Sequence, residues 1–208
     1  MVQPANTFKR VPNNEPIICA HRGPVQDLMF SPFHNNCLAT CSQDATLKIW
    51  MIPEGGYKEN EKNCDAELKG HTKKVTHLKF NPSAEFTLAS TGMEGSVKIW
   101  DIQNESAQMS FDNLGQQAWG MDWNYDGSML AILTKEKKMH VLDPRSNETA
   151  QSTRAHEGSK AQRLTWLGNS GHILSHGFSG FSERQWAVWD SRKIETPICM
   201  KKLDNHNL

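Results

Sequence analysis

Short apolar runs alternate with breaker residues along the chain, and the stretch from Gly70 to Asp101 shows this pattern most clearly. It contains three runs rich in β-branched and aromatic side chains, and Asn, Pro and Gly stand between them. These runs cover residues 75–80, 86–90 and 97–100. No helical period survives across so many breaks. The stretch therefore predicts three consecutive β-strands.

The same unit recurs along the chain. His21 and Trp50 are 29 residues apart, and so are His71 and Trp100. Successive copies end their third strand at positions separated by steps of 50, 42 and 47 residues, namely Trp50, Trp100, Leu142 and Trp189. A period of roughly 40 to 45 residues, with insertions in loops, is typical of four-stranded propeller blades.

The predicted fold is all-β, a partial β-propeller of about four antiparallel, four-stranded blades. Residues 1–16 carry Pro, Asn and Gln with little apolar content and are expected to form a lead-in, followed by the partial propeller over 17–208. The expected repeat units cover residues 20–69, 70–111, 112–154 and 155–203. Residues 17–19 and 198–203 each look like the outer strand of a blade, so we expect an open arc.

Composition offers no partner by itself. Lys plus Arg equals Asp plus Glu, at 23 each, so no overall field draws the chain onto nucleic acid or an anionic membrane. No apolar run is long enough to span a bilayer, and the N-terminal residues lack a signal-peptide pattern. We expect a soluble cytoplasmic protein without a nucleic-acid partner or a membrane span.

The cysteines do not form a recognisable framework. There are five, an odd number that suits a reducing compartment: Cys19, Cys37, Cys41, Cys64 and Cys199. Cys19, His21, His34, Cys37 and Cys41 lie close in sequence, but they lack the paired spacing of a zinc site. There is also no glycine-rich phosphate loop. We expect no metal and no cofactor.

Two copies of the repeat each bring together a histidine, a hydroxyl, an acid and a tryptophan. These sets are His21, Thr40, Asp44 and Trp50, and His71, Ser90, Glu94 and Trp100. Such a set resembles an acyl-transfer triad, but a catalytic set occurs once, in a cleft, whereas this one recurs in each blade. We therefore interpret the tetrads as structural groups that satisfy buried polar atoms, and we expect no enzymatic activity.

Basic residues on predicted loops and strand starts are candidates for partner binding, because loops carry most binding residues. The candidates are Lys73, Lys74, Arg163 and Arg184. Most exposed charges of this kind belong to a solvated surface and bind no partner.

The order of Gly-His, strand, Asn-Pro or Ser-Pro, strand, acidic turn, strand and Trp-Asp resembles the WD-repeat family. Further details resemble the coronins, above all Gly177-Phe178-Ser179 followed by Ser182-Glu183-Arg184-Gln185 and Trp189-Asp190. Other matching segments are Gly70 to Val75, Asp143-Pro144-Arg145 and Ala155-His156-Glu157-Gly158. The resemblance covers roughly residues 19–204.

Resemblance to coronin implies a seven-bladed propeller that binds actin filaments and other cytoskeletal proteins, with a cytoplasmic, cytoskeletal location. This chain departs from that plan, since most of the first blade, the later blades and the coiled coil are missing, and Ala20 replaces the glycine before the first histidine. It is expected to be a fragment, a split gene product or a reduced homologue. The alternative function is a general WD-repeat scaffold unrelated to actin, and hydrolysis by the tetrads is a third hypothesis.

Overall fold

The computed structural model describes residues 15–112, 114–146 and 148–204. Its regular elements in these ranges are strands, arranged as four separate antiparallel sheets of four strands each. Apart from its last two residues, the predicted lead-in over 1–16 lies outside the described residues. The all-β blade architecture predicted from the repeat is confirmed.

Each sheet is a blade whose strands follow one another in chain order, from the inner strand to the outer strand. Blade 1 contains β1 (Val25–Phe30), β2 (Cys37–Ser42), β3 (Thr46–Met51) and β4 (Ala66–Lys69). Blade 2 contains β5 (Val75–Phe80), β6 (Thr87–Gly92), β7 (Val97–Asp101) and β8 (Ser106–Phe111). Blade 3 contains β9 (Ala118–Trp123), β10 (Leu130–Thr134), β11 (Lys138–Asp143) and β12 (Glu148–Arg154). Blade 4 contains β13 (Arg163–Trp166), β14 (His172–Phe178), β15 (Arg184–Asp190) and β16 (Cys199–Asp204).

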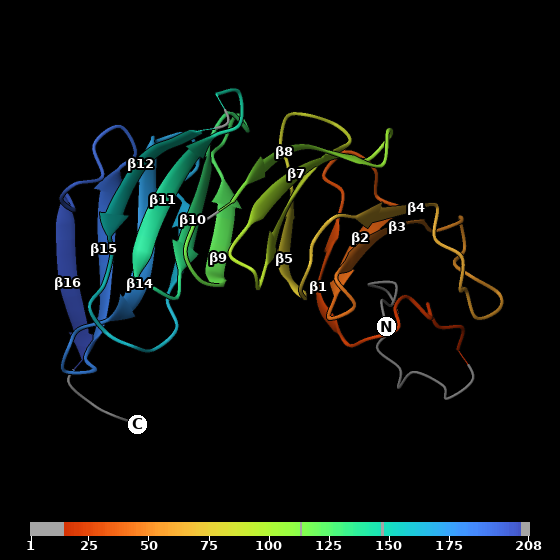
Figure 1. Ribbon diagram of the computed structural model, residues 1–208, viewed down its shortest axis with the longest axis horizontal. Coiled ribbons are helices and arrows are strands. Elements are labelled where there is room, and N and C mark those ends of the chain that lie inside the picture. Colours follow the sequence, from red (N-terminus) through yellow and green to blue (C-terminus); the bar gives the residue numbers. More distant parts are fainter. Residues whose placement is uncertain (1–14, 113, 147, 205–208) are drawn as a thin grey trace.

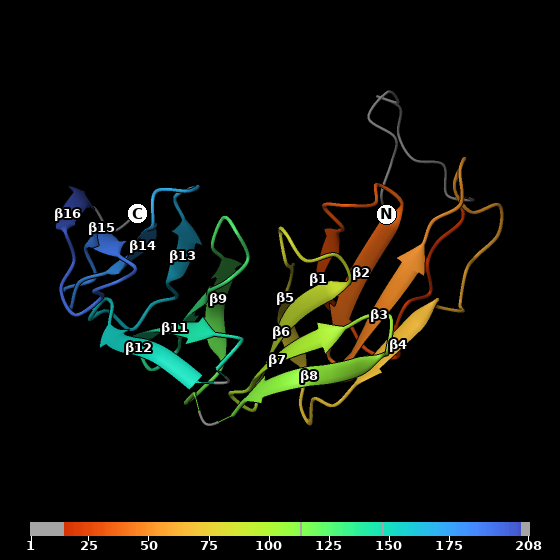
Figure 2. The same cartoon turned by 90° about the horizontal axis from the view of Figure 1, so that it is seen from above.

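The blades stand side by side along an arc (Figure 1). Their inner strands β1, β5, β9 and β13 contact one another in turn, and the blades fan outward from them (Figure 2). The arc is open between blade 4 and blade 1, as expected from blade curvature that does not close at four blades.

The core lies between the blades, because each sheet buries apolar side chains on both faces. One cluster joins Leu47 and Ile49 of blade 1 to Leu78 and Trp100 of blade 2. Equivalent clusters fill the space between blades 2 and 3 and between blades 3 and 4. Strand β2 is buried along its whole length, which explains why it reads as a continuous run of small and apolar residues.

Loops of the same class meet from blade to blade, so the arc has two distinct ends. The loops before the inner strands and the turns between second and third strands form one end, which we call the histidine end. There Leu114 N–H donates to Gly95 O at 3.2 Å, and Ala155 N–H donates to Lys137 O at 2.9 Å. At the opposite end, Asn81 Nδ2 donates to Gly127 O at 2.8 Å.

Two details differ from the expected strands. Residues 17–19 do not form an outer strand, because Ile18 makes a single parallel bridge to Glu61 and packs on the cluster around Trp50. Strand β14 extends to Phe178, whereas the apolar pattern alone predicts a second strand over residues 172–175, because β15 pairs with β14 along its full length.

The two end faces of the arc leave apolar side chains exposed where internal blades bury them. Leu28 is 48% exposed, whereas Leu78, at the same position of the repeat, is buried against blade 1. Val188 of blade 4 is only half-buried, although Ile49 and Ile99 at the equivalent positions are buried.

We therefore expect the isolated chain to dimerise or aggregate, because such faces drive association. Light scattering after size-exclusion chromatography should show a mass that rises with concentration. Leu28→Lys should weaken association, whereas Tyr125→Lys, on a turn at a residue that is 70% exposed, should not. A compact monomer that melts cooperatively at every concentration would contradict this expectation.

Candidate docking surface and its histidine tetrads

In blade 2 a chain of hydrogen bonds joins four buried or half-buried side chains. Trp100 Nε1 on β7 donates to Ser90 Oγ on β6 at 2.8 Å, and Ser90 Oγ lies 2.6 Å from His71 Nε2. His71, in the loop before β5, bonds through Nδ1 to Glu94 in the turn between β6 and β7. The chain thus ties one loop, one turn and two strands together.

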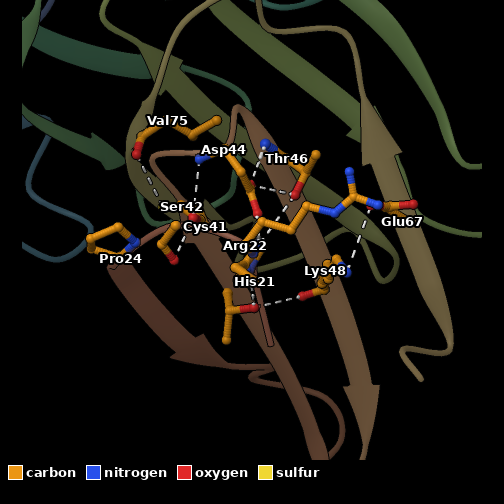
Figure 3. Close-up of polar contacts among 12 residues, drawn as sticks. His21, Arg22, Pro24, Cys41, Ser42, Asp44, Thr46, Lys48, Glu67 and Val75 are labelled. Carbon is orange, nitrogen blue, oxygen red and sulfur yellow. Dashed lines mark hydrogen bonds and ion pairs between the residues drawn. The ribbon is translucent and has the colours of Figure 1, made fainter. Parts of the chain in front are cut away.

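Blade 1 repeats this arrangement, and Figure 3 shows the part of it around His21, Asp44 and Thr46. Trp50 Nε1 donates to Thr40 Oγ1 at 3.1 Å, Thr40 Oγ1 lies 2.9 Å from His21 Nε2, and His21 Nδ1 lies 3.1 Å from Asp44 Oδ2. The Asp44 carboxylate also accepts from the Thr46 hydroxyl at 2.7 Å. The structure therefore brings together the members of both sets identified in the sequence.

Burial and hydrogen bonding set the protonation of these groups. Burial raises the pKa of Asp44, but the bonds from Thr46 and from the backbone of Arg22, with the charge of His21, outweigh it and lower the pKa to about 2. Burial lowers the pKa of His71, opposed by its bond to Glu94. A neutral imidazole then donates from Nδ1–H to the carboxylate and accepts the Ser or Thr hydroxyl at Nε2.

Blade 4 has a third set that the sequence pattern did not identify. His156 Nε2 lies 2.8 Å from Ser175 Oγ, which accepts from Trp189 Nε1 at 2.8 Å. At Nδ1 the partner is Gln185 Nε2, at 2.8 Å, and not an acid. The spacing of 19 residues from histidine to hydroxyl, shared by all three sets, was the signal available in the sequence.

The acid is displaced in blade 4 because its turn is longer. The hydroxyl and the tryptophan are 14 residues apart there, against 10 in blades 1 and 2. Glu183 instead bonds Ser179 Oγ at 2.9 Å and pairs with Lys202 at 2.7 Å. Burial, and then the charge of His176, lowers the pKa of His156 to about 4.

Blade 3 has lost the set. Ile132 and Leu142, both fully buried, occupy the hydroxyl and tryptophan positions. The histidine position falls on Asn113, which lies outside the described residues. Lys138 stands where Thr46 and Ser96 contact the histidine ring in blades 1 and 2.

The geometry of these sets suits stabilisation better than catalysis. Ser90 and Ser175 are fully buried, and each hydroxyl is already engaged by a histidine and a tryptophan. A nucleophile needs space for a substrate beside it. Within the described ranges, no group of three His, Cys, Asp or Glu side chains could hold a metal ion, and no helix is long and apolar enough to cross a membrane.

The balanced net charge hides a separation between the two ends of the arc. Cations of the described residues gather at the histidine end: Arg22, Lys69, Lys73, Lys74, Lys135, Lys137, Lys138, Arg154, Lys160, Arg163, Arg184 and Lys202. Carboxylates gather at the opposite end: Glu54, Glu59, Glu61, Asp65, Glu85, Asp101, Glu105, Asp126, Asp143, Asp190 and Glu195. At the histidine end, Asp44 and Glu94 are paired with the histidines. The separation is a net excess at each end, because the histidine end also carries Asp112, Glu136, Glu157 and Glu183, and the opposite end also carries Lys58, Lys62, Arg145, Arg192 and Lys193.

The four candidate partner-binding residues all lie at the histidine end, but they are not equivalent. Lys73 and Lys74 occupy the loop before β5 and are exposed and half-buried, respectively. Arg163, at the start of β13, reaches across to blade 3, where its guanidinium donates to Trp119 O. Arg184 begins β15 and is exposed.

Removing the shared hydroxyl tests the role of the polar chain. Ser90→Ala should destabilise the fold by about 1–3 kcal/mol, because it leaves Trp100 Nε1 and His71 Nε2 buried without a partner. The free energy of unfolding from urea titration measures this. Ser159→Ala, at an exposed loop position, should change it by less than about 0.5 kcal/mol, and equal effects of the two substitutions would refute the role.

The two kinds of set predict different histidine tautomers. Nitrogen-15 NMR at pH 7 should find Nδ1–H in His21 and His71 but Nε2–H in His156, because the partner at Nδ1 is an acceptor in the first two and a donor in the third.

Because the pKa of folded His156 is about 4, below the ordinary histidine pKa of 6.5, the contribution of His156 to stability is complete above pH 6.5. That contribution should be lost as the pH falls through 4. Gln185→Glu should raise the pKa of His156 in an NMR titration. An unchanged pKa, or one tautomer in all three rings, would refute the assignment.

Comparisons with known proteins agree with this architecture. The WD domain, G-beta repeat family matches residues 14–51 and 62–101. Coronin-2A of Bos taurus is 35% identical over 98% of this chain, and Coronin-like protein crn1 of Schizosaccharomyces pombe is 33% identical over 95% of it. Coronin-7 of Rattus norvegicus is 34% identical over 86% of the chain.

The chain matches only part of each relative, namely 40% of Coronin-2A, 33% of crn1 and 20% of Coronin-7. The crystal structure of the WD40 domain from Toxoplasma gondii coronin superimposes with a TM-score of 0.85 at 34% identity, covering 89% of this chain and 49% of that one. Sequence and structure thus point to the same relatives, and the chain is a WD-repeat protein homologous to the coronins over most of its length.

Proposed function

We propose that this chain binds actin filaments through its histidine end and acts without enzymatic chemistry in the cytoplasm, at the cytoskeleton. The observation that carries the proposal is the concentration of cations at one end of a coronin-like arc. The resemblance to coronins implies actin as the partner, and other cytoskeletal proteins as further ones. A basic surface on rigid blades fits a filament whose exposed surface is acidic.

Lys73 and Lys74 are the residues on which the proposal depends most. Neither ammonium group has a hydrogen bond or an ion pair in the structure over residues 15–112. The loop that carries them is fixed at both sides, since His71 is held by Glu94 and Lys74 O accepts from Met93 N at 2.9 Å. A fixed loop presents its charges with little loss of conformational entropy on binding.

Arg163 and Arg184 extend the same surface onto blade 4. Arg163 is anchored to the Trp119 carbonyl, so its side chain has a defined position beside blade 3. Arg184 lies directly after the turn that holds Glu183 and Ser179. We assign both residues a supporting role, because their geometry is set by neighbouring groups.

The tetrads contribute by positioning the loops of this surface, and not by chemistry. His21 and His71 each fix a loop of the histidine end to the adjacent turn. Because the curated relatives extend well beyond the matched part, binding by this chain is proposed for these four blades alone.

Co-sedimentation with actin filaments tests the proposal. The chain should pellet with filaments at low salt, and less of it should pellet as salt screens the surface charges. Charge reversal by Lys73→Glu and Lys74→Glu together should weaken binding about tenfold or more. The matched control, Lys58→Glu with Lys62→Glu, reverses two cations at the opposite end and should leave binding unchanged.

The outcomes separate actin binding from a general scaffold. Absence of pelleting at every salt concentration would contradict the proposal and favour a WD-repeat scaffold for another complex. Pelleting that is insensitive to reversal of Lys73 and Lys74 would remove these residues from the interface.

A further inference from the structure

Blade 3 carries a basic cavity at the histidine end that none of the tetrads explains. Its volume is about 570 Å³, and it is lined by Glu136, Lys137, Lys138, Ser152, Thr153 and Arg154. These residues belong to the turn before β11 and to the facing ends of β11 and β12. A volume in this range suits a small ligand.

Two cations face each other directly at this cavity. Lys138 on β11 is the cross-strand partner of Arg154 on β12, and both side chains are exposed. In the structure over 114–146 and 148–204 neither is hydrogen-bonded or ion-paired to an acid. Like charges placed directly opposite each other destabilise a sheet, so an anion between them would remove a repulsion.

Beneath this pair lies a buried histidine without partners. His140 is 7% exposed, and both of its ring nitrogens are buried with no hydrogen-bond partner among the described residues. It is two residues from Lys138 on β11 and is paired in register with Ser152, so it shares a sheet face with two residues of the cavity wall but does not itself line the cavity. An imidazole left in this state lacks an acceptor for its N–H.

In blades 1 and 2, the residue equivalent to His140 is a lysine that has a polar partner on the neighbouring strand. Lys98 Nζ donates to its cross-strand partner Ser110 at 2.8 Å, and Lys48 lies 3.7 Å from its cross-strand partner Glu67. Blade 3 places His140 opposite Ser152 without such a bond. The difference accompanies loss of the tetrad, because Lys138 now stands at the position of Thr46 and Ser96.

We propose that this cavity binds a phosphate group carried as a dianionic monoester. Lys138 and Arg154 supply charge and donors, and the Ser152 hydroxyl supplies a further donor. His140 lies on the same sheet face behind them, so its ring reports on a charge bound in the cavity. Arg and Lys together match the charge and geometry of phosphate. These groups donate hydrogen bonds and carry positive charge, so a cation, or a ligand that can only donate hydrogen bonds, has no complementary group to pair with.

The neighbouring charges limit what can enter. Lys137 Nζ already donates to Glu157 O at 2.6 Å, so its ammonium group adds positive charge to the rim but is held in place by that bond. Glu136 faces Gly115 of the preceding loop, and its carboxylate is the acidic group of the wall. A compact anion that stays close to β12 avoids Glu136, whereas a metal cation would meet two opposed positive charges.

The test uses the whole chain in phosphate-free buffer, with inorganic phosphate and a phosphoserine peptide as separate probes. Histidine side-chain NMR should show a saturable shift of His140, while His71 in the tetrad of blade 2 stays unchanged. Saturation by either probe supports the site. The stronger of the two identifies the source of the phosphate as free or protein-bound.

One substitution separates binding from folding. Lys138→Glu places a carboxylate opposite Arg154, so it should raise the melting temperature of the ligand-free chain while weakening phosphate binding about tenfold or more. Lys58→Glu, at the opposite end, should change neither quantity.

The proposal is overturned if His140 does not respond to either probe, or if Lys138→Glu binds phosphate as the parent chain does. It is independent of actin binding, which is measured by pelleting and rests on Lys73 and Lys74.

Discussion

A buried hydroxyl shared by a tryptophan and a histidine is the interaction on which three of the four blades depend. In blade 2, Ser90 Oγ receives Trp100 Nε1–H and bonds His71, which in turn holds Glu94. Each group would be costly to bury alone, and together they satisfy one another except at Glu94 Oε2, which is buried without a hydrogen-bond partner among the described residues. Because this chain of hydrogen bonds joins a loop, a turn and two strands, it also sets the shape of the histidine end.

Variation at this one interaction explains how the blades differ. Blade 4 keeps the histidine and the hydroxyl but exchanges the acid for Gln185, which reverses the direction of the hydrogen bonds. Blade 3 replaces the polar chain with Ile132 and Leu142, which pack without any polar requirement. Because blade 3 has no histidine tetrad to complete, Lys138 and His140 take no part in one. The cavity of blade 3 lies beside them.

The sequence predicted the blades well because strand signals are local. Breakers such as Asn81-Pro82 and the alternation within residues 75–80 fix where strands begin and end, and the repeat period fixes their number. It predicted two tetrads because their spacing is the same. It missed Gln185, because a longer turn moves the acid away and only coordinates show which side chain takes its place.

Other features depend on tertiary structure and could not be read from residue order. The apolar pattern of residues 17–19 predicted an outer strand. A strand needs a neighbouring strand to pair with, and Ile18 makes a single bridge, to Glu61. Balanced composition predicted no overall field, but it could not show how charges are distributed, because a count of charges does not tell which end of a blade each loop reaches. The position of His140 without a partner likewise follows from register and not from its neighbours in sequence.

The most direct test of the polar chain is a double-mutant cycle between its two ends, with unfolding free energies measured for Glu94→Gln, Trp100→Phe and the double variant. The structure records no hydrogen bond between Glu94 and Trp100 within residues 15–112, and Ser90 and His71 connect them. If these hydrogen bonds act as one continuous unit, the coupling energy between Glu94 and Trp100 should be about 0.5–3 kcal/mol. Additivity within about 0.3 kcal/mol would show that the chain does not act as a unit.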